Sequence, residues 1–226
     1  MWVNIGAMET TRAGRPRLTE RRRPGTTARE EILDAAAELF TTRGYVSTST
    51  RAIAEAVGIR QASLYHYFKT KDELLSALLH QTVTPTLVFL AELRQAEPSA
   101  AQSLHALAAF DGAQLLTSRW NLGALYLLPE LREARLATFW TERERLRLAY
   151  LDLSRAILAV TGVADDAADL PFRLVESLVN MWSPPPRPDP STLAGHVADA
   201  CLRVLGVNDD ALTALRASGP AWAGHL

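Results

Sequence analysis

The segment Thr50–Phe68 constrains the fold of this chain more than any other, because its pattern indicates two short helices joined by a tight turn. Gly58 can take the positive φ angle that a sharp turn needs, and Ala54 is small enough for the second helix to cross the first closely. Apolar side chains supply one side of the pair, at Ile53, Val57, Leu64 and Phe68. The segment therefore predicts a helix-turn-helix, a motif whose second helix enters a DNA groove.

Hydroxyl side chains mark the starts of the neighbouring helices. Ser47–Thr50 offers hydroxyls to cap the first helix of the motif, and Thr70–Glu73 has the pattern of a capping box that opens the next one. Upstream, Thr27–Glu30 is another capping box, and apolar residues then recur at helical spacing as far as Gly44. We therefore expect a three-helix head over residues 26–70.

A set of residues in and around this motif follows a known pattern: Thr50-Arg51, Ile53-Ala54, Val57-Gly58-Ile59, Leu64-Tyr65, Tyr67-Phe68 and Lys71-Asp72-Glu73-Leu74-Leu75. The pattern resembles the tetracycline-repressor (TetR/AcrR) family of bacterial transcriptional regulators over about residues 27–80. Beyond that segment the chain is similar to the family only in length and helical character. The resemblance implies an all-α protein with a DNA-binding head and a larger helical domain for ligand binding and dimerisation.

The chain has a strongly basic start. Residues 10–29 carry a net charge of +6, although the whole chain has a formal net charge of −1. The arm over residues 1–25 has little apolar content, so we expect it to be disordered in the free protein. Gly14-Arg15-Pro16-Arg17 resembles the core of an AT-hook, which lies in a narrow minor groove. The arm is either such a groove-binding segment or a solubilising tail, and its arginine density favours DNA.

The remainder, residues 71–226, has helical periodicity throughout. We expect helices at 71–96 with a bend at Pro85, 98–118, 122–128, 130–160 with an end at Gly162, 171–182 and 190–205, and a short one within 207–226. The helix that begins at Pro171 is apolar on most sides and must be covered. By the resemblance, the helices at about 166–182 and 190–206 of two subunits form a four-helix bundle, which predicts a homodimer on a roughly palindromic operator of double-stranded DNA.

The start of the second motif helix is expected to face base edges, through Arg60, Gln61, Ala62 and Ser63. By the resemblance, phosphates are held by Thr50, Arg51, Tyr65, Tyr67 and Lys71, with Thr48 as a further candidate. Each residue taken singly also suits a plain structural role, as a partly buried aromatic or a solvated charge. Their occurrence in one helix-turn-helix frame, downstream of the basic arm, favours DNA binding.

The family usually releases DNA when a small molecule binds within its C-terminal helices. Candidate ligand-binding residues are polar or aromatic groups near apolar faces: Asp111, Gln114, Trp120, Tyr126, Trp140, Phe172, Glu176 and Asn180. Asp111 either reaches this pocket or faces water in a row with Gln114 and Ser118, and the cost of burying an unpaired acid favours water. Glu176 and Asn180 either line the pocket or bond across the subunit interface. We expect an apolar or aromatic effector that biases the separation of the two heads.

Other functional classes find little support in the sequence. No phosphate loop, nucleophile elbow or metal-binding pair of histidines is present, so we expect no catalytic residue, metal or cofactor. The single Cys201 rules out an intrachain disulfide and suits a cytoplasmic protein. Leu74–Ala91 contains too many polar residues for a membrane anchor. The sequence therefore predicts a sequence-specific transcriptional regulator, a repressor by analogy with the family. The alternative is an architectural DNA-binding protein that uses the basic arm without sequence choice.

Overall fold

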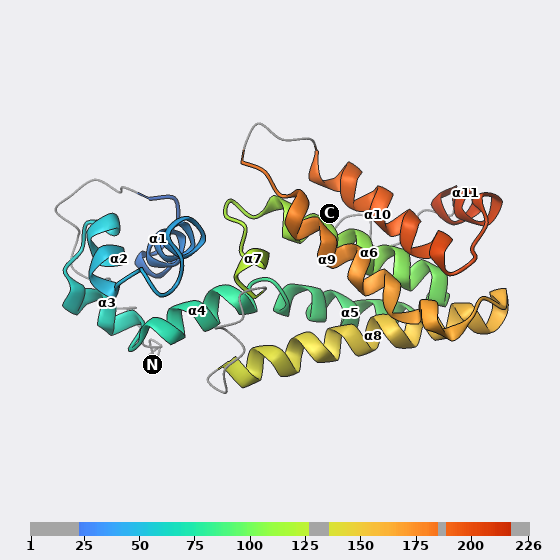
Figure 1. The fold of residues 1–226 in the computed structure, drawn as a ribbon, viewed down its shortest axis with the longest axis horizontal. Helices are drawn as coiled ribbons and strands as arrows, with labels where there is room; N and C mark the ends of the chain where they lie inside the picture. Colours follow the sequence, from blue (N-terminus) through green and yellow to red (C-terminus); the bar gives the residue numbers. More distant parts are fainter. Residues whose placement is uncertain (1–22, 127–135, 185–188, 218–226) are drawn as a thin grey trace, which may run out of the picture.

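The computed structural model describes residues 23–126, 136–184 and 189–217, and every regular element in these ranges is a helix. Two parts lie side by side along the long axis of the molecule, a small head and a larger body (Figure 1). Helix α4 (Lys71–His80) runs from the head towards the body, and α7 (Gly123–Tyr126) lies between the two parts. The predicted all-α class with a three-helix head is confirmed.

The head consists of α1 (Ala28–Arg43), α2 (Thr50–Val57) and α3 (Gln61–Tyr67). The Thr27 capping box at the start of α1 is formed in full, and the Ser49 hydroxyl caps α2. Gly58 ends α2 in the left-handed conformation, with φ 78°, which gives the sharp turn into α3. Ile53 and Leu64 are completely buried. The head therefore forms from local signals that the sequence displays.

The predicted continuous helix over 71–96 is divided in two. Helix α4 ends at His80, and α5 (Thr84–Ala96) begins after a turn, with Pro85 in its first turn, where a missing N–H costs nothing. By length and composition alone, Lys71–Ala96 is apolar enough to cross a membrane. A helix buried in the core of a folded protein passes the same test. Here Leu74, Leu75, Leu78 and Leu79 are all buried in the protein core.

Helix α6 (Ala100–Thr117) forms the centre of the body. It contacts α5, α8 (Ala137–Thr161), α9 (Leu170–Met181) and α10 (Pro190–Val204). Gly112 permits the close approach of two of these neighbours, because a Cβ atom there would lie 2.7 Å from Leu178 Cδ1 and 3.2 Å from Ala194 Cβ. The single buried Cys201 of α10 packs nearby, with its thiol 3.5 Å from the Pro171 carbonyl oxygen.

The later helices end near the predicted positions. Gly162 closes α8 in the left-handed conformation, and Asp189 caps α10; the predicted start of α8 near residue 130 lies outside the described residues. A 3-10 helix, η3 (Asp165–Asp169), precedes α9. The last helix, α11 (Asp209–Ala217), is attached through Asp199 of α10, whose buried carboxylate accepts hydrogen bonds from Arg216 and pairs with His105 at 3.1 Å.

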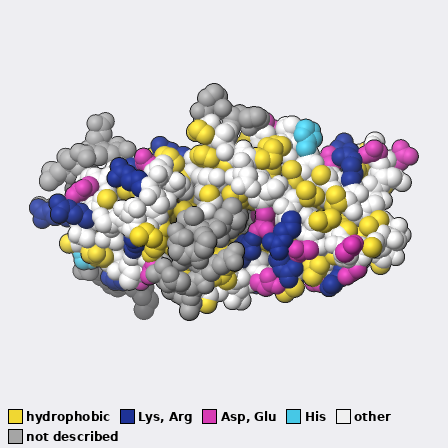
Figure 2. All heavy atoms as spheres, in the orientation of Figure 1, with side chains coloured by type: hydrophobic (Ala, Val, Ile, Leu, Met, Phe, Trp, Pro, Cys, Tyr) yellow, Lys and Arg dark blue, Asp and Glu magenta, His cyan; other side chains and the backbone are white. Residues whose placement is uncertain are grey.

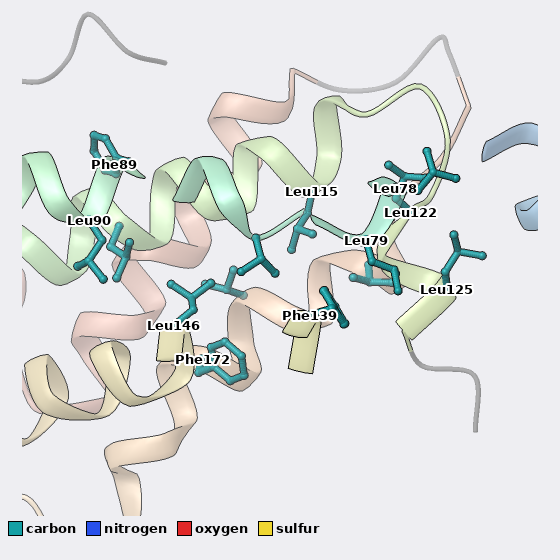
Figure 3. Close-up of a cluster of buried hydrophobic side chains, with 14 of the residues drawn as sticks. Leu78, Leu79, Phe89, Leu90, Leu115, Leu122, Leu125, Phe139, Leu146 and Phe172 are labelled. Carbon is teal, nitrogen blue, oxygen red and sulfur yellow. The ribbon is translucent and has the colours of Figure 1, made fainter. Parts of the chain in front are cut away.

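One cluster of buried apolar side chains joins the head to the body (Figure 3). Leu78 and Leu79 of α4 lie near Leu122 and Leu125 at α7, and Leu115 and Phe139 continue the cluster into α6 and α8. All six side chains are less than a tenth exposed. Burial of apolar surface therefore holds the two parts together.

Candidate nucleic-acid interface

The second motif helix, α3, presents its start and one side to solvent. Arg60, Ala62 and His66 are exposed, and Tyr65 and Tyr67 are 39% and 48% exposed. Ser63 is half-buried, and Leu64 points into the core. Lys and Arg side chains stand at the outer end of the head with acidic groups beside them, and on the body the two kinds of charge are also interspersed (Figure 2). The head thus offers cations, hydroxyls and small side chains on one accessible helix.

Gln61 occupies a different environment from its neighbours in α3. Its side-chain nitrogen donates to Thr50 Oγ1 at 3.0 Å and to Tyr65 Oη at 3.3 Å, and these two hydroxyls lie 3.1 Å apart. This triangle links the start of α2 to α3, so the amide nitrogen of Gln61 is engaged within the protein. A base contact through this nitrogen requires the triangle to open.

Two residues predicted to contact phosphates, Thr48 and Lys71, form hydrogen bonds within the head. Thr48 is only 2% exposed, and its hydroxyl donates to the carbonyl oxygens of Leu39 and Gly44. The predicted phosphate contact by its side chain therefore does not fit the structure. Lys71 donates to the Tyr45 and Thr48 carbonyl oxygens at 2.9 and 3.0 Å, and its side chain remains half-exposed.

A surface hollow of about 440 Å³ lies where α2, α3 and α4 meet. We call it the hydroxyl hollow, and its lining residues are Val46, Ser47, Thr48, Ser49, Thr50, Tyr65, Lys69, Thr70 and Lys71. The starts of α2 and α4 both contribute residues to it, and helix starts attract anions through unpaired N–H groups. Hydroxyl and ammonium groups also bind phosphate oxygens. Arg51 stands nearby on α2, exposed and paired with Glu55 at 2.9 Å.

The basic arm and its AT-hook-like segment lie outside the described residues, apart from the end of the arm. Arg23, which the sequence assigns to the disordered arm, instead packs against the head. Its guanidinium donates to Asp34 at 3.1 Å and to Glu38, and its Nε donates to the Ala56 carbonyl oxygen. Arg23 thus joins the base of the arm to α1 and α2, because acidic side chains of α1 and a carbonyl group of α2 accept its hydrogen bonds.

Asp111 is buried, so the prediction that it faces water is wrong. It is 4% exposed and accepts hydrogen bonds from Thr86 Oγ1 at 3.1 Å and Tyr150 Oη at 3.0 Å. Burial raises the pKa of Asp111 to about 6, although these two hydrogen bonds and the charge of Arg143 act to lower it. Thr86 and Tyr150 come from α5 and α8, which means that this acid ties three helices together.

Gln114 continues this polar group to the surface. It accepts a hydrogen bond from Thr86 Oγ1 at 3.0 Å and donates to the Gln81 carbonyl oxygen at 3.2 Å. Gln114 also lines a hollow of about 310 Å³ between the α4–α5 turn and the end of α6, together with Gln81, Thr82, Leu115, Thr117, Ser118, Leu122 and Gly123. We call this the junction hollow. The residues that line it bear no formal charge.

Three of the other predicted ligand residues lie around Arg143, whose guanidinium is 5.7 Å from the Trp140 ring and also contacts Phe172 and Glu176. The Phe172 ring lies near the guanidinium of Arg143, at 5.1 Å, and Glu176 pairs with both Arg143 and Arg173. Trp140 stacks edge-on against Phe139 with ring centroids 5.0 Å apart. Asn180 is exposed on α9, and the side chain of Tyr126 lies outside the described residues. Phe172 also packs edge-on against Tyr150, which donates to Asp111, so Asp111, Trp140, Phe172 and Glu176 belong to one connected group in the body.

Trp120 links the body to the head. Its Nε1 donates to Asp34 Oδ1 of α1 at 2.9 Å, and the Arg119 guanidinium lies 4.9 Å from its ring. Neither Asp34 nor the partners of Asp111 were identified from the sequence. Trp120 and Asp34 are 86 positions apart, and Tyr150 and Asp111 are 39 apart, so no local spacing indicates these pairs.

These features define a class of protein, the helix-turn-helix regulators with a helical body. A model of the family described as bacterial regulatory proteins, tetR family, matches residues 32–78. The chain is 52% identical to AmtR of Mycobacterium smegmatis, with 88% of this chain and 97% of that chain covered and a TM-score of 0.78. The chain therefore belongs to the tetR family of bacterial regulatory proteins. It is a DNA-binding transcriptional regulator, and dimers with a ligand-binding domain are typical of this family.

Two further comparisons cover the head and the fold. The transcriptional repressor KstR2 of Rhodococcus jostii is 47% identical over 51 residues, which are 23% of this chain and 25% of that protein. The match thus spans about a quarter of the length of this curated relative. The structure of AibR in complex with isovaleryl coenzyme A and operator DNA shares the fold, with 22% identity, 79% and 97% of the two chains covered and a TM-score of 0.57.

Proposed function

We propose that this regulator is a homodimeric repressor that binds a roughly palindromic operator in the cytoplasm and is released by a small molecule. The hydroxyl hollow is the observation that carries the proposal. It lies directly beside the exposed start of α3. One surface therefore combines a hollow suited to phosphate binding with side chains that can contact base edges. Phosphate contacts position such a protein on the duplex, and base contacts give it sequence choice.

The proposed contacts divide into two groups. Thr50, Arg51, Tyr65, Tyr67 and Lys71 hold phosphates, with Lys71 acting from the position that its two carbonyl bonds fix. Arg60, Ala62 and Ser63 reach base edges, where an arginine suits guanine and a methyl group suits thymine. Gln61 joins them when DNA displaces its hydrogen bonds to Thr50 and Tyr65.

The proposed dimer interface is formed by α9 and α10. Leu170 and Met181 on α9 are 44% and 53% exposed, and Leu193 and Val197 on α10 are half-buried in a single subunit. A Cβ atom at Gly195 would meet nothing within 4 Å, so a partner helix has room to approach closely there. Pairing of these faces removes apolar surface from water, which is the main source of dimer stability.

The proposed effector site is the junction hollow. Its volume is at the lower end of the range of about 300 to 1,000 Å³ for ligand pockets. Leu115 and Leu122 supply apolar walls, and Gln114 and Ser118 supply orienting polar groups. A small neutral ligand with an apolar part suits this lining. Occupation would act on the α4–α5 turn and on α7, which lie where the head meets the body.

The DNA-binding part is tested by fluorescence anisotropy with operator and scrambled duplexes at several salt concentrations. Replacement of Arg51 by Ala should weaken binding to both duplexes and reduce the slope of log K against log salt by about 1. Replacement of Arg60 by Ala should cost about 1–3 kcal/mol on the operator alone. Arg94→Ala, an exposed arginine of the body, is the control and should change neither value.

Two outcomes would contradict this proposal. Equal affinity of the native protein for operator and scrambled duplexes, with a steep salt slope, would instead indicate the architectural mode of binding. A monomer by light scattering at the concentration of the assay would exclude the dimer.

The effector part is tested with a panel of neutral aliphatic and aromatic amides and alcohols. Binding should raise the melting temperature and release the operator, and Leu122→Trp, which fills the hollow, should abolish both effects. The exposed Leu148→Trp on α8 is the matched control. Release that persists in Leu122→Trp would place the effector elsewhere.

A further inference from the structure

We infer that the Asp34 carboxylate fixes the orientation of each head on its body and thereby determines which half-site spacing the dimer accepts. This inference rests on the proposed function, because spacing has meaning only for a dimer on two half-sites. It assigns a positioning role to a residue of α1 that lies outside the helix-turn-helix. Its basis is a set of directional contacts that meet at one carboxylate.

Asp34 receives donors from two directions. Trp120 Nε1 donates to Oδ1 at 2.9 Å, and Arg119 Nη1 lies 3.3 Å from the same oxygen. Arg23, at the base of the basic arm, donates to Oδ2 at 3.1 Å. The Asp34 side chain is only 12% exposed. Hydrogen bonds to a charged acceptor are stronger than neutral ones, so this carboxylate is a firm contact between head and body.

The segment that carries Trp120 is itself held by α9. We call residues 118–122 the junction loop. Trp182 Nε1 donates to the Ser118 carbonyl oxygen at 2.9 Å, and Asn121 Nδ2 donates to the Val179 carbonyl oxygen at 2.9 Å. Both partners stand at the end of α9, the helix that contributes exposed Met181 to the proposed dimer face. Two hydrogen bonds and the backbone of the junction loop therefore connect the end of α9 to Trp120 and, through it, to α1.

The second connection between head and body is less restrictive. Helix α4 ends at His80 and α5 starts at Thr84, so no continuous helix fixes the direction of α4 relative to the body. The apolar cluster around Leu78 and Leu122 is close-packed, and at the end of α4 His80 Nε2 lies 3.6 Å from Glu142 Oε2 of α8. A head held through α4 and α7 without the Asp34 contact should sample a wider range of orientations. The Asp34 contact supplies the second fixed point that defines an orientation.

Orientation matters because operator DNA is itself regular. The recognition helices of a dimer meet half-sites about 34–36 Å apart, one helical turn. One added base pair moves a half-site by about 3.4 Å along the axis and also rotates it around the duplex. Heads held at two points should therefore reject such a change, whereas heads held only at α4 should tolerate it.

The test uses full-length protein and an operator series in which the half-site spacing is shortened or lengthened by one base pair. Trp120→Phe keeps most of the ring and removes the donor, and Asp34→Asn keeps an acceptor and removes the charge. We expect the native protein to lose about tenfold in affinity per base pair of change in spacing, and either variant to lose only about threefold. The difference between these two losses is of the size expected for one charge-assisted hydrogen bond. Asp165→Asn, which removes a carboxylate paired with Arg155 on the body surface, is the matched control and should follow the native profile.

A second measurement does not use DNA. A spin label on Thr42→Cys, an exposed site on α1, reports the distance between the two heads by electron–electron double resonance. Native Cys201 stays unlabelled, because burial raises its pKa to about 12. We expect a broader distance distribution in Trp120→Phe and Asp34→Asn than in the native protein or Asp165→Asn.

The possible outcomes separate this inference from the proposed function. Native spacing profiles and native distance widths in both variants would overturn the positioning role of Asp34 while leaving the repressor proposal intact. An equal change in Asp165→Asn would also overturn it. Failure of the unmodified protein to prefer operator over scrambled DNA would overturn the proposed function and this inference with it.

Discussion

The head and the body place their polar groups differently. In the head, the hydroxyl and cationic groups of α2, α3 and α4 surround an open hollow, and the core beneath them is mainly apolar, with Glu31 and Thr48 buried in it. In the body, Asp111, Thr86 and Tyr150 meet inside the core, and Asp199 pairs with other elements in a buried position. The head presents hydroxyl and cationic groups at an open surface hollow, whereas the body buries Asp111 and Asp199 between its own helices.

Substitution of a polar group should therefore have different consequences in the two parts. A polar group at the surface exchanges water for a partner when DNA binds, so substitution there changes affinity more than folding. A polar group in the core has no water to return to, and its loss leaves donors and acceptors unpaired. Substitutions in the body should therefore act on stability first, and those at the rim of the head should act on DNA binding first.

The largest expected effect is that of Tyr150→Ala. The Tyr150 side chain is completely buried, packs edge-on against Phe172 and donates to Asp111. Its loss should lower the free energy of unfolding by about 3–5 kcal/mol, measured by urea denaturation. Leu148→Ala, an exposed position two residues earlier on α8, should cost less than about 1 kcal/mol. Similar losses for the two variants would remove the contrast between core and surface.

The pH dependence of stability should follow from Asp111. Its pKa of about 6 in the folded protein lies above the ordinary value of 3.8, so folding disfavours the ionised form. The resulting penalty is present above pH 6 and is lost as the pH falls through 6 towards 3.8. Relative to Asp111→Asn, the native protein should therefore gain about 2 kcal/mol when the pH falls from about 7.5 to about 4.5. Urea unfolding of both proteins at the two pH values measures this, and parallel curves would exclude it.

A paired substitution of two glycines sharpens the comparison between the parts. Gly58 in the head and Gly162 in the body both end helices in the left-handed conformation, with φ 78° and 74°. Alanine at either position should lower the free energy of unfolding by about 1 kcal/mol. Only Gly58→Ala should also weaken operator binding, because it alters the turn before α3. Equal operator affinity of both variants would show that this turn is less constrained than proposed.

The smallest expected effect is that of Arg155→Ala on α8. Arg155 pairs with Asp165 at 3.3 Å, and both side chains are more than half exposed. Pairs of this kind contribute about 0–0.5 kcal/mol because water and salt screen them. Thermal unfolding at low and high salt should barely separate this variant from the native protein. A loss above about 1 kcal/mol would mean that surface charges on the body matter more than the comparison allows.

The sequence predicted the local structure of both parts better than the contacts between residues that are distant in the chain. The helices of the head, the capping box at Thr27, a hydroxyl cap within Ser47–Thr50 and the turn at Gly58 were all predicted, because each depends on neighbours a few residues away. The same holds for the helix ends at Gly162 and Asp189 in the body. The break between α4 and α5 was placed only approximately, as a bend at Pro85.

Side-chain partners across the fold were predicted far less well. Asp111 was expected to face water because burial of an unpaired acid is costly, and its hydroxyl donors Thr86 and Tyr150, 25 and 39 positions away, were not identified from the sequence. Thr48 was expected to hold phosphate, but its hydroxyl is used by carbonyl groups of the preceding turn. The DNA contacts of α3, the dimer face and the effector site remain predictions that the proposed experiments address.

The attachment of α11 has a practical consequence for handling the protein. Asp199 is 3% exposed, and although burial opposes its ionisation, hydrogen bonds from Arg216 and His105 lower its pKa. A truncation before Arg216 would leave a sequestered anion with a single imidazole neighbour, a loss that typically destabilises a domain. Affinity tags and fusion partners at this end should therefore follow residue 217, so that α11 keeps the contact between Arg216 and Asp199 of α10.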